Sequence, residues 1–336
     1  MGPPRPRFQG SSVAGDKGVA MRVGIDIGGT KVALRLFDES GRILVRERAK
    51  TRKHEGYRTV LEDVVRLVRV AAVDQGIGPE ELALVGVAAA GQIDPACGSV
   101  IVSPNLHWTN VPFRSDLEEA LGAPVRIEND VNAATYGEWR FGLERPARDV
   151  VGIFLGTGVG GGLILDGRLH RGSSGVGGEV GHITLNPYGY PCRCGNRGCF
   201  ETYCGGSYVA ERAREKLREG YRGTLWDVIE GQPRDLHLGH IEKAAGLGDE
   251  YCAAVWEEIV EYLGAGMQTI ANLLNPEVII LGGGVVMGTE RLVDEARTVM
   301  ERRAMTGTLA GLRVVKGRLG EDAATMGVAF MDERGT

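Results

Sequence analysis

The sequence predicts an α/β protein of two domains, whose halves contain two versions of one unit. VGIDIGGTKVALRLFDESGRIL, from Val23, reads as strand, glycine turn, strand, turn and strand. VVGIFLGTGVGGGLILDGRLHRG, from Val150, repeats that order. A chain of 336 residues can bury a large core, and two domains are expected rather than one. The 52 glycines gather in loops, which favours anion sites lined by backbone over a collagen-like repeat.

The composition restricts the classes of partner. Hydrophobic residues make up 43% and charged residues 25%, both ordinary for a globular protein. A net charge of −5 argues against a general nucleic-acid surface, and no apolar run is long enough to cross a bilayer, so we expect neither a nucleic-acid nor a membrane partner. Residues 1–20 lack the apolar core of a secretory signal and are expected to form a disordered leader. Three of the six cysteines follow a metal-binding pattern, which favours the reducing cytoplasm.

The first unit predicts strands at 21–27, 32–37 and 43–46. Its first turn consists of Gly28, Gly29, Thr30 and Lys31, and it offers backbone N–H groups, a hydroxyl and a cation to an anion. The turn is not a Walker A loop, because a strand follows it. A plain hairpin turn would explain the two glycines alone. Asp26, an acid in an apolar strand beside the turn, instead favours a site that organises magnesium.

The segment after the first unit predicts a helix at 57–75 and a buried strand at 82–90. The loop 103–108 then carries polar and aromatic side chains and is expected to form a pocket wall. Its Asn105 is open to the simpler interpretation of a turn residue. A strand at 124–127 leads to Asp130, at the start of a helix at 131–141. An acid at such a junction is ordinarily a helix N-cap.

The second unit carries the turn formed by Gly156, Thr157, Gly158, Gly160 and Gly161. The spacing Gly156-x-Gly158-x-x-Gly161 satisfies the dinucleotide fingerprint, but a strand follows where that fingerprint requires a helix. The two glycine hairpins resemble those that face each other across the cleft of actin-like ATPases and sugar kinases. This resemblance implies an actin-like, ribonuclease H-like fold with duplicated βββαβα cores.

The remaining chain predicts helices at 206–219 and 251–274, and the second could serve as core or as a subunit interface. A buried strand at 277–281 opens onto Gly282, Gly283 and Gly284, which allow a flat ligand to approach closely. A helix at 289–302, a strand at 312–315 and a closing helix at 322–331 complete the chain.

The stretch 179–201 is too rich in Gly and Pro for a helix or strand and predicts a metal centre. His182, Cys192, Cys194 and Cys199 supply the usual ligand set of a closed, four-coordinate structural zinc site, with no position left for catalytic water. The alternative is a set of buried free cysteines, which pack like small hydrophobic residues. The polar neighbours of these cysteines leave little core for them to join.

The same stretch carries a family resemblance. Glu179-x-Gly-His182, followed by Cys-x-Cys-Gly-x-x-Gly-Cys-x-Glu201, resembles the signature of the ROK sugar kinases and their repressor relatives. The resemblance implies that Glu179, His182 and Glu201 face sugar hydroxyls. It likewise implies that Asp130, in Glu-Asn-Asp-x-Asn-Ala, is a general base, and that the other sugar-binding residues are Gly91, Asn105 and Asn129. The glycines at 282–284 would border the adenosine.

The resemblance is strongest to the bacterial ROK glucokinases and implies ATP-dependent phosphorylation of glucose, with Mg²⁺ and a structural Zn²⁺. Both glycine turns would hold the β- and γ-phosphates, Lys31 would add positive charge, and Asp130 would take the hydroxyl proton. We expect a small domain at 21–131, onto which a helix at 320–336 packs back, and a large domain at 132–319. A homodimer or homotetramer is expected.

Other acceptors stay open at this stage, because mannose, fructose, N-acetylglucosamine and N-acetylmannosamine kinases share the same polar ligands. Polyphosphate as donor stays open as well. A sugar-sensing repressor that does not catalyse is the rival from another class. It would need an N-terminal helix-turn-helix domain of several tens of residues, and only twenty residues precede the first strand.

Overall fold

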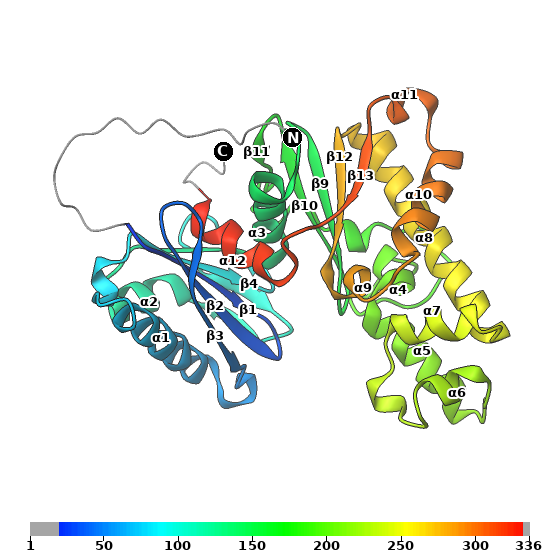
Figure 1. The fold of residues 1–336 in the computed structure, drawn as a ribbon, viewed down its shortest axis with the longest axis horizontal. Helices are drawn as coiled ribbons and strands as arrows, with labels where there is room; N and C mark the ends of the chain where they lie inside the picture. The colour runs from blue at the N-terminus through cyan, green and yellow to red at the C-terminus, as the bar shows by residue number, and fades with distance from the viewer. Residues whose placement is uncertain (1–19, 332–336) are drawn as a thin grey trace, which may run out of the picture.

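The computed structural model describes residues 20–331 and contains two five-stranded mixed sheets (Figure 1). The predicted leader at 1–20, apart from its last residue, and the end of the predicted helix at 320–336 lie outside the described residues. The first sheet has the order β3-β2-β1-β4-β8. Its strands are β1 Arg22–Ile27, β2 Lys31–Phe37, β3 Ile43–Lys50, β4 Leu84–Ala89 and β8 Val125–Asn129.

The second sheet repeats the topology of the first, with the order β11-β10-β9-β12-β13. In each sheet the first two pairings are antiparallel and the last two are parallel. The predicted duplication and α/β class are therefore confirmed. The strands of the second sheet are β9 Val150–Leu155, β10 Val159–Leu165, β11 Arg168–Leu169, β12 Val278–Gly282 and β13 Arg313–Lys316.

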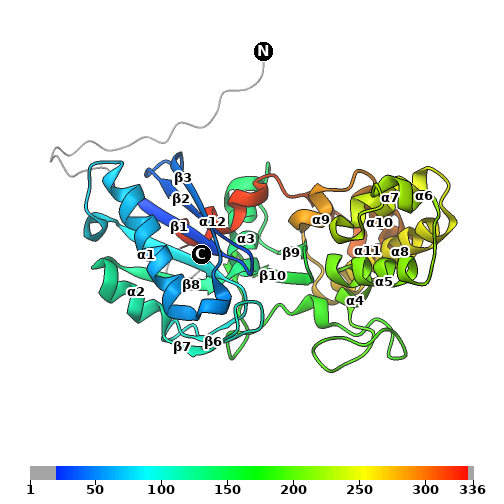
Figure 2. The same cartoon turned by 90° about the horizontal axis from the view of Figure 1, so that it is seen from below.

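Helices cover both faces of the first sheet (Figures 1 and 2). α1 (Tyr57–Val73) and α2 (Phe113–Leu121) lie on the outer face, and α1 buries the apolar stripe that its sequence spacing predicts. α12 (Ala323–Phe330) packs on the other face, against β1 and β4. Successive residues of β1 point to opposite faces of the sheet. Val23, Ile25 and Ile27 therefore join the core beneath α1, whereas Gly24 faces α12.

A pair of helices, α3 (Asp130–Gly137) and α12, lies between the two sheets. The pair is packed closely enough to require glycine. A Cβ on Gly24 would lie 1.9 Å from the carbonyl oxygen of Thr325, and one on Gly327 would lie 1.8 Å from that of Ala133. Small residues thus bring the backbones of α3, α12 and β1 together. The proposed domain boundary at 131/132, which falls at this pair, stays a prediction.

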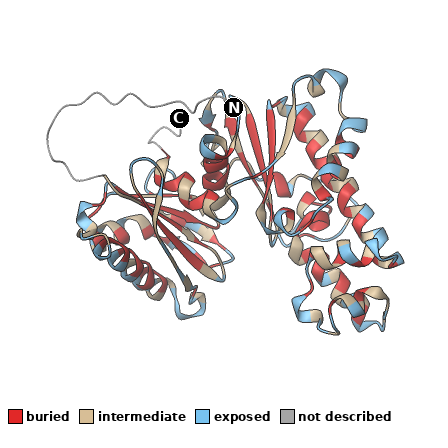
Figure 3. Ribbon diagram, in the orientation of Figure 1, coloured by how far each residue is buried: buried red, intermediate tan, exposed pale blue. Residues whose placement is uncertain are grey.

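The second sheet carries a helical layer (Figure 3). Its helices are α4 Phe200–Cys204, α5 Gly206–Arg218, α6 Thr224–Val228, α7 Leu238–Gly246, α8 Glu250–Leu274, α9 Gly283–Met287, α10 Leu292–Arg303 and α11 Thr306–Leu309. α8 packs against α4, α7 and α10 and buries one face, so this long helix belongs to the core. The oligomeric state stays a prediction. Sequence spacing missed α6 and α7, and α9 with α10 replaces the helix predicted at 289–302.

A small third sheet corrects the prediction for residues 103–108. This segment is the tip of a hairpin between β6 (Val100–Ser103) and β7 (Trp108–Val111), with β5 (Gln92–Ile93) beside β6. Trp108 is 3% exposed and stacks on Phe113 with ring centroids 5.1 Å apart, so it is core rather than pocket wall. Strands of four residues are too short to show a clear alternation.

Two boundaries also differ from the prediction. β3 continues to Lys50, beyond the predicted strand at 43–46. Its later residues alternate between half-buried and exposed at the edge of the sheet, so they do not form an apolar run. The helix predicted at 131–141 ends at Gly137 and continues as a π turn over Glu138–Gly142. Within residues 20–331, no helix combines the length and apolarity needed to span a membrane.

Candidate active site

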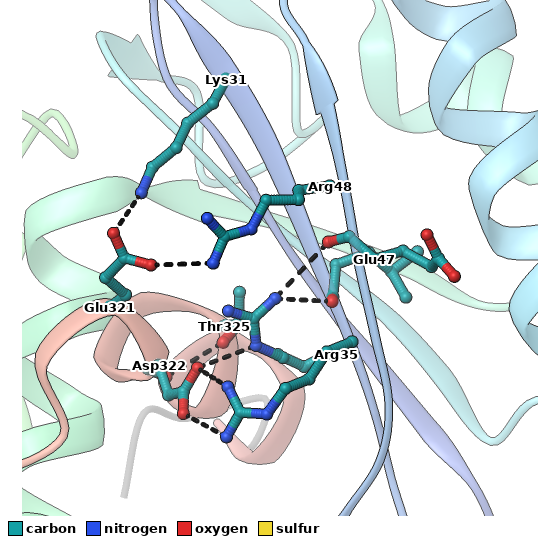
Figure 4. A network of polar contacts seen from close by, with 9 residues as sticks. Lys31, Arg35, Glu47, Arg48, Glu321, Asp322 and Thr325 are labelled. Carbon is teal, nitrogen blue, oxygen red and sulfur yellow. Dashed lines mark hydrogen bonds and ion pairs between the residues drawn. The ribbon is translucent and has the colours of Figure 1, made fainter.

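The first glycine turn is a hairpin turn held by Thr51, the residue that follows β3. The N–H of Gly28 donates to the carbonyl of Lys31 at 3.0 Å, and the hydroxyl of Thr51 donates to the carbonyl of Gly28 at 2.7 Å. The Lys31 ammonium extends to Glu321, on the turn η6 (Gly320–Asp322), with Nζ and Oε1 2.7 Å apart (Figure 4). Both side chains are substantially exposed, at 44% and 60%. A phosphate at this turn would therefore compete with Glu321 for the cation.

Asp26 lies at the end of β1 beside this turn. Burial raises the pKa of Asp26 to about 7, and the nearby charge of Asp130 acts in the same direction, while Lys31 opposes them. At neutral pH the carboxyl group is therefore close to half protonated. A bound divalent cation would hold it ionised, as the predicted magnesium role requires.

Asp130 and Asn129 stand at the junction of β8 and α3. Asn129 is the N-cap, since its Oδ1 accepts hydrogen bonds from the N–H groups of Val131 at 2.9 Å and Asn132 at 3.0 Å. Asp130 is the first residue of the helix, so the N-cap is Asn129 and not Asp130. Burial raises the pKa of Asp130, and the charge of Glu179 adds to this, against the opposing hydrogen bond from Val131 N–H. A raised pKa suits a general base.

A small cavity of about 50 Å³ brings together residues from both halves of the chain. Among the predicted sugar ligands it is lined by Gly91, Asn129 and Glu179, and among the second glycine turn by Gly160 and Gly161. The amide of Asn129 donates to the carbonyl of Gly91 at 3.0 Å, which fixes these two relative to each other. Sequence reasoning missed the remaining lining residues, Gln92, Val131, Asn132, Gly175, Val176, Gly177 and Gly178. The glycine run before Glu179 was an available signal.

Asn105 does not line this cavity. It is exposed at the tip between β6 and β7, and its carbonyl oxygen lies 3.1 Å from where a Cβ on Gly29 would stand. Among the residues that the structure describes, its side chain has no hydrogen-bond partner. Asn105 is therefore placed beside the first glycine turn with its amide available.

A second cavity, of about 450 Å³, lies beside the second glycine turn. Gly156 and Thr157 line it from the turn and Gly284 from α9. The turn is fixed to α5, because Gly206 N–H donates to the carbonyl of Gly156 at 2.8 Å and Ser207 Oγ donates to that of Thr157 at 2.7 Å. The other lining residues are Gly206, Ser207, Ala210, Arg214, Leu236, His237, Leu238, Gly239, Val285 and Gly288.

Gly282 and Gly283 support this second cavity without lining it. Gly283 has a φ of +88°, and a Cβ there would lie 2.3 Å from the carbonyl oxygen of Leu155. Only glycine therefore allows α9 to start so close to β9. Sequence analysis missed the residues from α5 and α7, because their approach to the turn depends on packing between distant segments.

The four predicted zinc ligands form one cluster. The ligand atoms of His182, Cys192, Cys194 and Cys199 all lie within 4.8 Å of one another. The sulfurs of Cys194 and Cys199 are 3.7 Å apart, and Cys192 Sγ lies 3.8 Å from His182 Nδ1. Zinc–sulfur bonds of about 2.3 Å in a tetrahedron place sulfurs roughly 3.8 Å apart, so the cluster fits zinc.

Two of the three cysteines are protonated in the absence of a cation. Burial raises the pKa of Cys199 to about 12 and raises that of Cys192, so both stay thiols when no cation is bound. A zinc ion would hold them as thiolates. The donor set therefore suits a closed metal site.

Glu201 connects this cluster to the second glycine turn. It lies on α4, so the predicted loop ends in a helix at Phe200, and a single 3₁₀ turn covers Val180–His182. Its Oε1 accepts hydrogen bonds from Cys192 Sγ and from Tyr208 Oη, each at 3.2 Å. Its Oε2 would lie 2.5 Å from a Cβ on Gly158. The carboxylate of Glu201 therefore lies between the zinc loop and the second glycine turn.

Comparisons with known proteins cover almost the whole chain. The sequence model of the ROK family matches residues 22–334. A glucokinase of Streptomyces coelicolor is 33% identical over 314 residues, which are 93% of this chain and 97% of that protein. A xylose repressor of Caldicellulosiruptor bescii is 28% identical over 94% of this chain and 79% of its own length.

A solved structure extends the likeness to the fold. The crystal structure of a ROK family glucokinase from Streptomyces griseus, in complex with glucose and AMPPNP, superposes with a TM-score of 0.77 at 34% identity. The match covers 92% of this chain and 98% of that one. The actin-like class predicted from the two glycine hairpins is therefore confirmed.

Proposed function

The chain belongs to the ROK family, and from that premise we propose that it is an ATP-dependent hexose kinase that converts glucose to glucose 6-phosphate. The observation that carries the proposal is that one hairpin, β9–β10, borders two cavities. Gly160 and Gly161 line the small polar cavity with Asn129 and Glu179, and Gly156 lines the larger one. A sugar in the first and a nucleotide in the second would meet at the hairpin.

We propose for the site residues the roles that the family resemblance implies. Asp130 takes the proton of the attacking hydroxyl, while the two glycine turns hold the β- and γ-phosphates through backbone N–H groups. Asp26 organises the magnesium ion that accompanies ATP, and Lys31 leaves Glu321 to neutralise phosphate charge. Zinc, held by His182 and the three cysteines, keeps the loop around Glu201 rigid and takes no part in the transfer.

Glucose is the proposed acceptor because the segments around Gly91, Asn105 and Asp130 are similar to those of ROK glucokinases. Mannose, fructose, N-acetylglucosamine and N-acetylmannosamine are the alternatives. A site that hydrogen-bonds hydroxyls discriminates strongly against a sugar that lacks one, and less strongly against an epimer. The repressor relative supports a second candidate, a sugar sensor that does not catalyse.

The test is an ADP-release assay with Mg-ATP and each of the five sugars. The highest kcat/KM with glucose supports the proposal, and preference for another sugar keeps the reaction and changes the acceptor. No turnover, with sugar binding still measurable by calorimetry, would favour the sensor.

Zinc is tested separately by element analysis of the purified protein and of Cys194→Ser. We expect about one zinc per native chain, loss of zinc in the variant and weaker sugar binding, because Glu201 would lose its fixed position. The control is Cys97→Ser, which removes an exposed cysteine outside the cluster and should change neither quantity. A native protein without zinc would refute the metal assignment.

A further inference from the structure

A basic cavity of about 730 Å³ lies beside the second cavity, where the end of α5 meets α6 and the turn η5 (Pro233–Asp235). The helices α5 and α6 lie at one end of the molecule (Figure 1). The volume of the basic cavity is within the range of small-molecule sites. Within the described part of the chain, no acidic residue lines it. The lining residues are four arginines, Arg214, Arg218, Arg222 and Arg234, with Leu217, Trp226 and Pro233.

We propose that this cavity binds a small phosphorylated anion and that the bound anion weakens nucleotide binding in the neighbouring cavity. The first part is independent of the proposed function. The second part rests on the proposal that the second cavity, beside Gly156 and Thr157, is the nucleotide site.

Two of the four arginines carry a positive charge that has no acidic partner among the described residues. Arg218 and Arg234 are exposed, and within residues 20–331 neither guanidinium group has a hydrogen bond or ion pair. Exposed arginines elsewhere commonly have acidic partners, as Arg193 has Glu211 at 3.0 Å. The helix dipole favours Arg218 at the end of α5, but Arg222 and Arg234 lie outside any α-helix. An anion in the cavity would relieve the repulsion among them.

The cavity is also partly preorganised. The guanidinium carbon of Arg222 lies 4.3 Å from the centroid of the Trp226 ring. The same side chain donates to the carbonyls of Leu217 at 2.8 Å and Tyr221 at 2.7 Å. These contacts hold one guanidinium in place before a ligand arrives, which lowers the entropic cost of binding. Guanidinium groups match phosphate oxygens in a two-point geometry, so a phosphoryl group suits this lining.

Arg214 connects the basic cavity to the nucleotide cavity, because it lines both. Its Nε donates to the carbonyl of Pro233 at 2.8 Å, and its Nη2 donates to those of Arg234 at 3.1 Å and Leu236 at 3.2 Å. Leu236 is itself part of the nucleotide cavity wall. An anion beside Arg214 would reduce the positive potential that the nucleotide phosphates meet, so ATP should bind less tightly.

The experiment is calorimetric titration of the full chain with inorganic pyrophosphate or with glucose 6-phosphate. Saturating AMPPNP and glucose are present, so that the glycine turns and the sugar site are occupied. The test variant is Arg218→Ala/Arg234→Ala, and the control is Arg145→Ala/Arg168→Ala, which removes the same charge from exposed positions outside the cavity. The two ligands distinguish an inorganic source of the phosphoryl group from a sugar phosphate.

We expect one site for at least one ligand, binding at least tenfold weaker in the test variant, and unchanged binding in the control. In the assay without anion, the test variant should keep its normal kcat. The binding anion should raise the KM for ATP about threefold in the native protein and leave it unchanged in the test variant. Equal binding by both variants, or no binding of either ligand, would overturn the site. Binding with no change in the KM for ATP would overturn the link.

Discussion

The two glycine hairpins occupy equivalent places in sheets of the same topology, yet they differ in charge. β1 ends Asp26-Ile27 before Gly28, and β9 ends Phe154-Leu155 before Gly156. Lys31, the first residue of β2, corresponds to Val159, the first of β10. The first unit therefore supplies an acid and a cation, and the second supplies backbone groups and an apolar wall. A duplicated frame fixes where a ligand can bind, and a few side chains decide which unit carries the chemistry.

The strongest test of this comparison is Asp130→Asn, since Asp130 follows the first sheet. The variant keeps the size of the side chain and removes the base, so kcat should fall by about 10²- to 10⁴-fold while glucose affinity changes little. The assay is ADP release together with calorimetry of glucose binding. The exposed Asp166, changed to Asn in the β10–β11 turn, is the control and should keep its activity. Near-normal turnover of Asp130→Asn would end the base assignment.

The next test compares equivalent glycines of the two sheets, Gly24 and Gly152. A Cβ on Gly24 would meet the Thr325 backbone at 1.9 Å, whereas one on Gly152 would meet the Thr135 hydroxyl at 2.3 Å. A side chain can rotate away and a helix backbone cannot. Gly24→Ala should therefore lower the free energy of unfolding by about 3 kcal/mol or more, and Gly152→Ala by roughly 1–2 kcal/mol. Urea unfolding measures both losses. Equal losses would show that α12 and α3 accommodate the added methyl group equally well.

A smaller effect is expected for Lys31→Met. Loss of the cation should raise the KM for ATP about tenfold and leave the KM for glucose unchanged, because the charge serves the phosphates. The control is Arg48→Met, which removes the other cation that pairs with Glu321 but leaves the turn intact. If both variants change the KM for ATP equally, Lys31 acts only by holding Glu321.

The smallest effect concerns the pH dependence of stability. Asp26 has an ordinary pKa of 3.8 and a folded pKa of about 7, so the folded state holds its proton more tightly than the unfolded state. This contribution is complete below pH 4 and is lost as the pH rises through 7. Asp130 and Glu321 strengthen the shift, while Lys31 and Arg35 oppose it.

The Asp26 contribution is isolated in an Asp130→Asn background, where the second acid cannot titrate. In that background and without ligand, the Tm of Asp26→Asn relative to that of its parent should increase by a few degrees between pH 5 and pH 8. Thermal unfolding followed by circular dichroism measures this difference. A constant difference across that range would mean that Asp26 is not shifted.

Local patterns in the sequence predicted the two units and the zinc cluster, because a strand, a turn and four ligands within 18 residues need no distant partner. Features that depend on distant packing were not predictable in this way. The Lys31–Glu321 pair joins residues 290 positions apart, and the second cavity needs α5 and α7 beside the second glycine turn. The burial of Trp108 could not be predicted either, because a short hairpin shows no burial pattern of its own. The roles of the site residues stay predictions.

The helix pair α3 and α12 has a mechanical consequence. The chain passes from the first sheet to the second through α3 and returns from β13 through η6 to α12, so two covalent connections lie side by side. A body joined to another at two neighbouring points can turn about the line through them but resists twisting and sliding. Their contact is made largely by backbone and small side chains, which lack the interlocking ridges that oppose such a turn. We therefore expect the two halves to open and close by rotation about a single hinge axis.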